Sequence, residues 1–217
     1  MIRKPPNRHL RQRGTATIEF ALCVGLFWIP LFFGASQFGL ELIQAIQVTH
    51  ACRDAGHMYA YGISFSQTSN QYLLASFAPN LKVDPTGQGG SSVVILSTVN
   101  YIDAVECQAG GYASTCPNFG QIVFTNRVVI GNPALHTSSF GTPTTDSTGT
   151  GNVIPGTPST PGYLNQSNAV VVGFPGISLS TGSTGQQYAY ISEMYSRSQS
   201  LNWFLRPSSW VNAASFF

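Results

Sequence analysis

An apolar run near the N-terminus is the strongest constraint on this chain of 217 residues. From Phe20 to Phe38 only Ser36 and Gln37 are clearly polar. These nineteen residues, as a helix rising about 1.5 Å per residue, reach roughly 28 Å, nearly the hydrocarbon thickness of a bilayer. We therefore expect one membrane-spanning helix. Glu19 lies at the start of the run, where an unpaired carboxylate costs on the order of 3 kcal/mol and normally marks a functional position.

Basic residues are concentrated before the apolar run. Five of the ten Lys and Arg residues lie there, namely Arg3, Lys4, Arg8, Arg11 and Arg13. This asymmetry predicts that the N-terminus stays in the cytoplasm. Removing the first 14 residues would take away these five cations and no acid, which moves the formal net charge from +2 to −3. The basic balance therefore belongs to the leader and indicates no nucleic-acid partner.

Three interpretations of the N-terminal segment compete. A secretory signal peptide cut after Ser36 would leave a chain beginning at Gln37. However, the apolar region of a signal peptide is usually only about 7 to 15 residues long and carries no acid. A plain single-span membrane anchor does not explain why an acid, Glu19, lies at the start of the apolar run. The third interpretation is a short basic leader that ends in Gly14, followed by an acid at the fifth residue of the mature chain and then by Phe20. Only this interpretation accounts for every feature.

The third pattern resembles a type IV prepilin. Within that superfamily, the stretch RGTATIEFALCVGLFWIPLFFGASQFG is similar to TadE-like proteins, minor pilins or pseudopilins of the tight-adherence (Flp, type IVc) pilus system. The segment Gln44–Gly56 is similar to the amphipathic extension of that family, although Arg53-Asp54-Ala55-Gly56 stands where the family usually carries an Arg-Glu-Gly-Ala-like run. Gln187–Asn202 resembles the terminal strand of the family. The specific signal comes from about the first sixty residues.

The resemblance implies a mechanism for the N-terminal residues. A prepilin peptidase would cut between Gly14 and Thr15, and the Glu19 carboxylate, followed by Phe20, would pair with the Thr15 amine of a neighbouring subunit and fix the register. Such pairing neutralises two charges that are costly in a low-dielectric setting. Alternatively, the Glu19 side chain does not pair with another subunit and only extends to the membrane–water interface on the cytoplasmic side.

The implied location is the bacterial inner membrane, with a single pass, a cytoplasmic N-terminus and a periplasmic C-terminal domain that can enter an extracellular pilus. The implied partners are the prepilin peptidase, other pilins or minor pilins, the inner-membrane assembly platform and the lipid bilayer. No cofactor is implied. Two alternative functions remain open: a tethered or secreted surface-binding (adhesin-like) module, and a pseudopilin of a type II secretion system.

The expected fold class is α+β, with a long N-terminal helix and a small antiparallel sheet packed on it. We divide the chain into a leader at 1–14, a transmembrane and extended amphipathic helix at 15–61, and an exported domain at 62–217. Ala35 and Gly39 form a small-xxx-small pair that favours close helix packing. Alternating or β-branched residues predict four strands, at 91–105, 121–130, 168–174 and 187–197.

The segment Thr137–Gly162 separates the second and third expected strands. In it, 21 of 26 residues are Thr, Ser, Gly or Pro, a composition that predicts an exposed, mobile loop without a core. Cys107 and Cys116 flank a short loop between the first two strands, and in an exported domain they predict a disulfide, whereas Cys52 has no obvious partner.

Enzymatic chemistry finds little support in the sequence. The chain has no GxSxG, P-loop or GxGxxG motif, and its eight carboxylates are scattered. His50, Asp54 and His57 have the helical spacing of a metal site, but no HExxH motif supports one. We therefore expect neither catalysis nor a bound metal. The aromatic-rich C-terminal segment is interpreted as core packing or helix docking.

Overall fold

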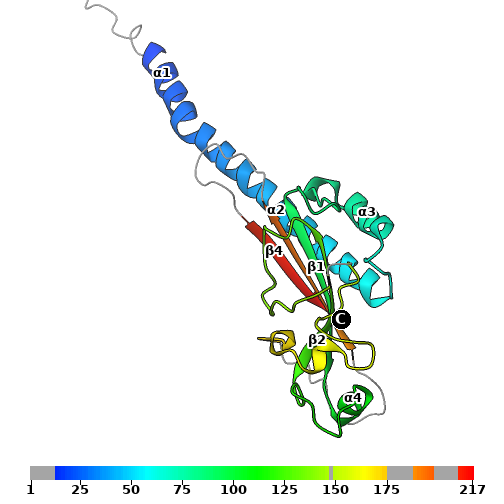
Figure 1. Ribbon diagram of the computed structural model, residues 1–217. Helices are drawn as coiled ribbons and strands as arrows, with labels where there is room; N and C mark the ends of the chain where they lie inside the picture. Colours follow the sequence, from blue (N-terminus) through cyan, green and yellow to red (C-terminus); the bar gives the residue numbers. More distant parts are fainter. Residues whose placement is uncertain (1–12, 147–148, 175–187, 198–209) are drawn as a thin grey trace, which may run out of the picture. The chain divides into compact units, whose positions relative to one another are not determined.

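The computed structural model describes residues 13–146, 149–174, 188–197 and 210–217 (Figure 1). The chain divides into two units, residues 1–43 and residues 44–217, and the described part of each is treated separately. The leader residues 1–12, residues 198–202 of the expected terminal strand, and Gln187 lie outside the described residues. A long apolar helix followed by a small antiparallel sheet confirms the expected α+β class.

The first unit is helical throughout its described part. It contains α1 (Arg13–Cys23), the π-helical turn η2 (Val24–Trp28) and the start of α2 (Ile29–Ala60). Pro30 explains the π-helical turn, because proline has no N–H to donate and its ring collides with the carbonyl four residues earlier. The N–H of Ile29 instead donates to the carbonyl of Val24, five residues back, so that the helix widens and continues.

The second unit is built on a four-stranded sheet in the order β2-β1-β3-β4. The strands are β1 (Ser92–Tyr101), β2 (Ile122–Gly131), β3 (Tyr188–Arg197) and β4 (Trp210–Phe216), and every pair is antiparallel. A bulge at Thr98/Val99 shifts the β1–β2 register. The helices of this unit are the end of α2, α3 (Thr68–Phe77) and α4 (Ala104–Ala109), with 3-10 turns η3 (Pro79–Leu81), η4 (Gly162–Leu164) and η5 (Ser167–Ala169).

The two faces of the sheet support two hydrophobic clusters, because successive side chains of a strand point to opposite faces. On one face Val94, Leu96 and Met194 pack with Val48 and Cys52 of α2. The opposite alternation contributes to a second cluster that loops and 3-10 turns cover, whose buried members include Val99, Val123, Phe124, Val153, Leu164 and Ile191. The domain thus has a helical layer on one side and a loop layer on the other.

The structure corrects three expectations about this domain. Three of the four expected strands are present, but residues 168–174 form the turn η5 and a single bridge from Val170 to Val123. The fourth strand is instead β4, in the segment interpreted as an aromatic tail. The loop 137–162 does contribute to the core, because Val153 is only 4% exposed and bridges pair Asn152 with Asn126 and Val153 with Thr145.

Candidate assembly site

The residues of the expected cleavage and register site lie on one helix. Gly14, Thr15, Glu19 and Phe20 all belong to α1, with Gly14 and Thr15 in its first turn. Thr15, Glu19 and Phe20 are exposed, and Phe20 is 70% exposed. Within the part of the chain that the structure describes, no hydrogen bond or ion pair is recorded for the Glu19 carboxylate.

Large apolar side chains remain exposed along the first unit. Residues such as Leu22, Leu26, Phe32 and Phe38 are each more than 60% exposed, and no residue of η2 is buried. The described helix from Thr15 to Ala60 is long and apolar enough to cross a membrane. A surface of this size without polar cover fits lipid or other helices rather than water.

The small-residue pair lies on the same helix. Ala35 is exposed, Gly39 is half-buried, and a Cβ atom added to Gly39 would meet no atom within 4 Å. The backbone around Gly39 is therefore open in this chain. Small residues of this kind allow close approach between helices in a membrane.

The end of α2 has a different role, because it is packed on the sheet of its own domain. Val48, Cys52 and Ala55 are fully buried. The Cys52 thiol donates to the carbonyl of Ser192 at 3.2 Å, and Ser192 Oγ donates to the carbonyl of Cys52 at 2.8 Å. These reciprocal hydrogen bonds fix α2 on β3. The sequence showed no partner for Cys52, and the structure assigns it to this buried contact.

The expected cysteine pair is joined in the structure. Cys107 in α4 and Cys116 form a disulfide with their Cα atoms 5.4 Å apart. The Asp103 carboxylate caps α4 by accepting from the N–H groups of Val105 and Glu106, which satisfies two free donors of the first turn. The cap and the disulfide together hold the β1–β2 connection.

A buried polar network holds the start of the 137–162 loop, and the sequence analysis did not find it. Arg127 of β2 is 6% exposed, and its guanidinium donates to Ser97 Oγ at 2.9 Å, the Gly141 carbonyl at 2.6 Å and Ser138 Oγ at 3.1 Å. Ser138 and the Ser139 N–H in turn donate to the Glu193 carboxylate. Burial lowers the pKa of Arg127 to about 10, and the charge of Glu193 opposes this shift. In the sequence, the signal for this network is limited to two charged residues within expected strands, Arg127 and Glu193.

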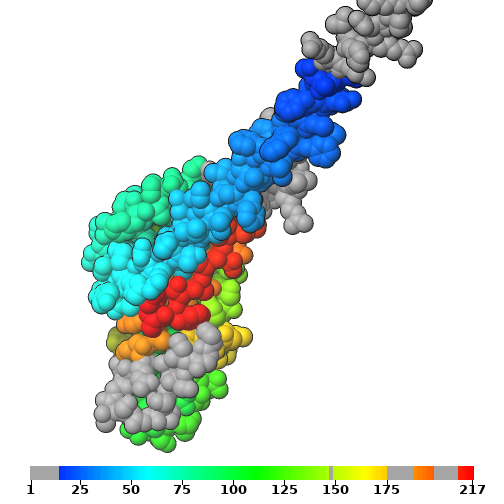
Figure 2. All heavy atoms as spheres, turned by 180° about the vertical axis from the view of Figure 1, so that it is seen from behind, coloured from blue at the N-terminus to red at the C-terminus, as the bar shows by residue number. Residues whose placement is uncertain are grey.

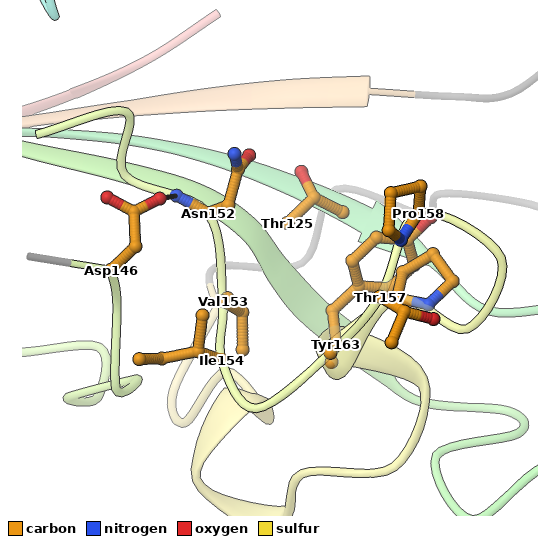
Figure 3. A pocket seen from close by; sticks show the side chains of 11 residues that line it. Thr125, Asp146, Asn152, Val153, Ile154, Thr157, Pro158 and Tyr163 are labelled. Atoms are coloured by element: carbon orange, nitrogen blue, oxygen red, sulfur yellow. Dashed lines mark hydrogen bonds between the residues drawn. The ribbon is translucent and has the colours of Figure 1, made fainter. Parts of the chain in front are cut away.

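The rest of the loop borders a cavity of about 470 Å³ (Figure 3). Its wall combines apolar side chains, including Val153, Ile154 and Pro158, with Asp146 and Asn152. The Asp146 carboxylate accepts from the N–H groups of Thr150 and Asn152 and from the Thr150 hydroxyl, so it mainly braces its own turn. Tyr163 also lines the cavity, and burial raises its pKa to about 12, with smaller contributions from Glu106 and Tyr188.

The three titratable residues near the end of α2 have different neighbours in the structure. His50 and Asp54 line a small pocket of about 190 Å³ beside α3. The His57 ring instead lies 4.4 Å from the ring of Phe217. Among the described residues, no group of three His, Cys, Asp or Glu side chains is placed to hold a metal ion.

The comparison with known protein families supports the resemblance found in the N-terminal segment. Residues 14–57 match the model of the TadE-like protein family, which confirms the resemblance over this segment. No curated protein and no solved structure matches the chain. The TadE-like family is a structural family associated with tight-adherence pili, and the apolar helix of this chain indicates single-pass membrane anchoring.

Proposed function

We propose that this chain is a minor pilin or pseudopilin of a tight-adherence (Flp, type IVc) pilus, cut by a prepilin peptidase after Gly14. The observation that carries the proposal is the coincidence of the TadE-like match, residues 14–57, with an apolar helix whose first part has exposed side chains. A pseudopilin of a type II secretion system would also be cleaved by a prepilin peptidase, but the TadE-like match favours the tight-adherence system.

In this proposal Glu19 sets the register between subunits. Cleavage frees the Thr15 amine, a cation that lies one helical turn from the Glu19 position. Each charge is costly near hydrocarbon, and the pairing of one subunit's amine with the next subunit's carboxylate offsets part of both costs. The apolar side chains of α1 and α2 then exchange lipid contacts for helix packing, with Ala35 and Gly39 at close approaches.

The location follows from the same proposal. The protein is held in the bacterial inner membrane with the leader in the cytoplasm and residues 44–217 in the periplasm, and the assembly platform passes it into the filament. A disulfide between Cys107 and Cys116 supports an oxidising compartment for this domain.

The proposal is tested by the mass and N-terminal sequence of the membrane-extracted protein, with and without a co-expressed prepilin peptidase. We expect a chain beginning at Thr15 only when the peptidase is present, and no cleavage in Gly14→Val. Gly25→Val is the matched control, because a Cβ at Gly25 would meet no atom within 4 Å. A chain beginning at Gln37 would instead identify an ordinary signal peptide, and an uncut chain in both conditions would identify a simple tether.

The role of Glu19 is tested separately by incorporation of the subunit into filaments. Glu19→Gln keeps the shape of the side chain and removes its charge, so we expect cleavage to proceed and incorporation to fall at least tenfold. Glu19→Asp keeps the charge and should retain more incorporation than Glu19→Gln. Equal incorporation of the wild type and Glu19→Gln would remove the charge-pairing mechanism.

A surface-binding module is the second candidate, and the cavity beside the 137–162 loop is the observation that favours it. Deletion of the loop is a poor test, because Val153 belongs to the core. The substitutions Thr157→Ala and Pro158→Ala alter the wall of the cavity instead. Loss of surface binding in these variants with normal filament incorporation would favour this candidate over a purely structural subunit.

A further inference from the structure

The cavity beside the 137–162 loop has a wall that the loop itself holds in place. The N–H of Thr157 donates to the carbonyl of Thr160 at 2.9 Å, and the N–H of Thr160 donates to the carbonyl of Thr157 at 3.1 Å, so the two residues close a tight turn. A Cβ atom added to Gly156 would lie only 2.2 Å from the backbone nitrogen of Gly162, so two backbone segments cross there in close contact. These contacts fix the wall before a ligand arrives, which lowers the entropic cost of binding.

The polar groups of the cavity are fixed in the same way. The Asp146 carboxylate accepts from the N–H groups of Thr150 and Asn152, both at 3.1 Å, and from the Thr150 hydroxyl. The side-chain carbonyl of Asn152 accepts from the side-chain amide of Asn126 at 3.2 Å. Asp146 and Asn152 both line the cavity, so a carboxylate and an amide are held at defined positions in its wall. Such groups form hydrogen bonds with the hydroxyl groups of a ligand.

The two ends of the cavity differ in their chemistry. In Figure 3 the side chains of Asp146 and Asn152 lie at one end of the labelled group, and those of Pro158 and Tyr163 lie at the other. The rings of Pro158 and Tyr163 offer flat apolar surface. Burial raises the pKa of Tyr163 to about 12, which keeps its hydroxyl protonated and able to donate at neutral pH. A ligand that spans the cavity therefore needs both an apolar face and hydrogen-bonding groups.

The charge and size of the cavity favour a small neutral ligand. Among the described residues that line it, Asp146 is the only charged one, and none is Lys, Arg or His. An anionic ligand would therefore meet a like charge with no cation to offset it. The charge of Asp146 is already stabilised by the hydrogen bonds of its own turn, so the site does not require a cationic ligand. The volume of about 470 Å³ lies within the usual range for small-molecule sites, roughly 300 to 1,000 Å³.

We propose that this cavity binds a neutral pyranose unit of a carbohydrate. A pyranose ring combines both required properties in one molecule, because its C–H groups form an apolar face and its hydroxyls lie around the rim. The apolar face packs on the rings of Tyr163 and Pro158, and the hydroxyls form hydrogen bonds with Asp146, Asn152 and Thr125. The inference rests on the second candidate of the proposed function, surface binding, and names the chemical class of its ligand.

The position of the cavity leaves the packing of α2 undisturbed. Val153, which lines the cavity, belongs to the hydrophobic cluster on the loop side of the sheet, whereas Val48 and Cys52 of α2 belong to the cluster on the other side. Figure 2 shows a face formed by the cyan end of α2 and the red strand β4, with yellow-green loop residues at its margin. A bound carbohydrate therefore does not compete with the contacts between α2 and the sheet.

The test measures sugar binding to the full chain in micelles of lauryldimethylamine oxide, a detergent without a sugar head group. Saturation-transfer difference NMR is recorded with the methyl glycosides of glucose, galactose, mannose and N-acetylglucosamine. Sialic acid and glucosamine serve as the anionic and cationic comparisons. Tyr163→Leu removes the aromatic ring, and Asp146→Asn removes the charge at nearly constant size. Pro158→Ala, at an exposed position, keeps the test valid if either of these variants does not fold.

Tyr72→Leu and Asp84→Asn are the matched controls. Tyr72 is 53% exposed on α3, and Asp84 braces its own turn by accepting from the N–H and the hydroxyl of Thr86. Neither Tyr72 nor Asp84 lines the cavity. We expect saturation transfer to at least one neutral glycoside, about tenfold weaker affinity in the cavity variants through the loss of one stacking or hydrogen-bonding group, and unchanged affinity in the controls. Sialic acid and glucosamine should bind more weakly than the neutral glycosides.

The absence of saturation transfer to all of the neutral glycosides would overturn the inference, as would equal affinity in all variants or tighter binding of sialic acid or glucosamine. The surface-binding assay with Thr157→Ala and Pro158→Ala is carried out on the same preparations. Surface binding that depends on the cavity, without sugar binding, would reject the carbohydrate ligand alone. Sugar binding in the cavity, with surface binding unchanged in these two variants, would count against the surface-binding function alone.

Discussion

The two parts of the N-terminal helix differ in composition, one nearly all apolar and the other amphipathic, and they have opposite surroundings. In residues 15–43 side chains such as Leu22 and Leu26 are 65% and 70% exposed. In residues 44–60 Val48, Cys52 and Ala55 are fully buried against the sheet. The difference shows that high apolar content does not by itself place a helix in a domain core. The first part has a recognisable sequence pattern and no fold partner within the described residues, while the second part is part of a domain core.

Matched Leu→Ala substitutions test this comparison most strongly. Leu96 is fully buried between α2 and the sheet, so Leu96→Ala should lower the free energy of unfolding by about 3 kcal/mol through lost burial and a residual cavity. Leu22→Ala, in the exposed part, should leave the unfolding of the domain unchanged. Urea unfolding of the full chain in detergent micelles, followed by tryptophan fluorescence, measures both. Equal losses in the two variants would contradict the separation of the two parts.

Removal of the disulfide is expected to have a slightly smaller effect on the same domain. The bond between Cys107 and Cys116 closes a loop with a sequence separation of 9. On the chain-entropy model, opening a loop of this length lowers the free energy of unfolding by about 2.5 kcal/mol. The double variant Cys107→Ser/Cys116→Ser should show this loss, and Cys23→Ser in the exposed helix should not. A stable double variant would show that Asp103 capping and packing suffice to hold α4.

The sequence predicted best where a short segment carries its own pattern. The apolar run and the TadE-like resemblance lie within the first sixty residues, so both could be found without knowledge of the fold. The strands β1, β2 and β3 were also found, because alternation and β-branched residues are local signals. The class of the fold followed from these elements and from the continuous helix.

Two glycines of α2, Gly39 and Gly56, allow the exposed and buried parts of the helix to be compared within one element. A Cβ added to Gly56 would lie 2.2 Å from a ring atom of Phe217 and 2.9 Å from Ser192 Cβ, so Gly56→Ala forces the sheet or the Phe217 ring to move. We expect a loss of about 2 kcal/mol in the free energy of unfolding. Gly39→Ala meets no atom within 4 Å, so it should not destabilise the domain. If Gly39 packs against another subunit, the same substitution should reduce filament incorporation, which a co-assembly measurement would detect.

The features that the sequence did not predict depend on contacts between distant residues. Trp210–Phe216 becomes a strand because β3 supplies its hydrogen bonds, and its own apolar pattern is equally compatible with a packed tail. The 137–162 loop is held by Arg127, which lies in β2, and by Glu193, which lies in β3. Residues 168–174 have the composition of a strand, but only Val170 forms a β-bridge, because other residues of the segment form η5 and core contacts. None of these partners can be read from local sequence.

The smallest expected effect is a pH dependence confined to the exported domain. His136 stacks on Tyr195 with ring centroids 3.7 Å apart, and burial lowers its pKa below the ordinary value near 6.5, although the negative charge of Glu193 opposes this shift. Below about pH 6.5 the unfolded chain therefore binds a proton that the folded chain resists, so stability falls as the pH is lowered until the folded imidazole is protonated as well. His136→Phe keeps an aromatic ring at Tyr195 and removes the titration. Urea midpoints between pH 5 and pH 8 should fall less steeply in this variant than in the wild type, and identical slopes would show that groups other than His136 set the pH dependence.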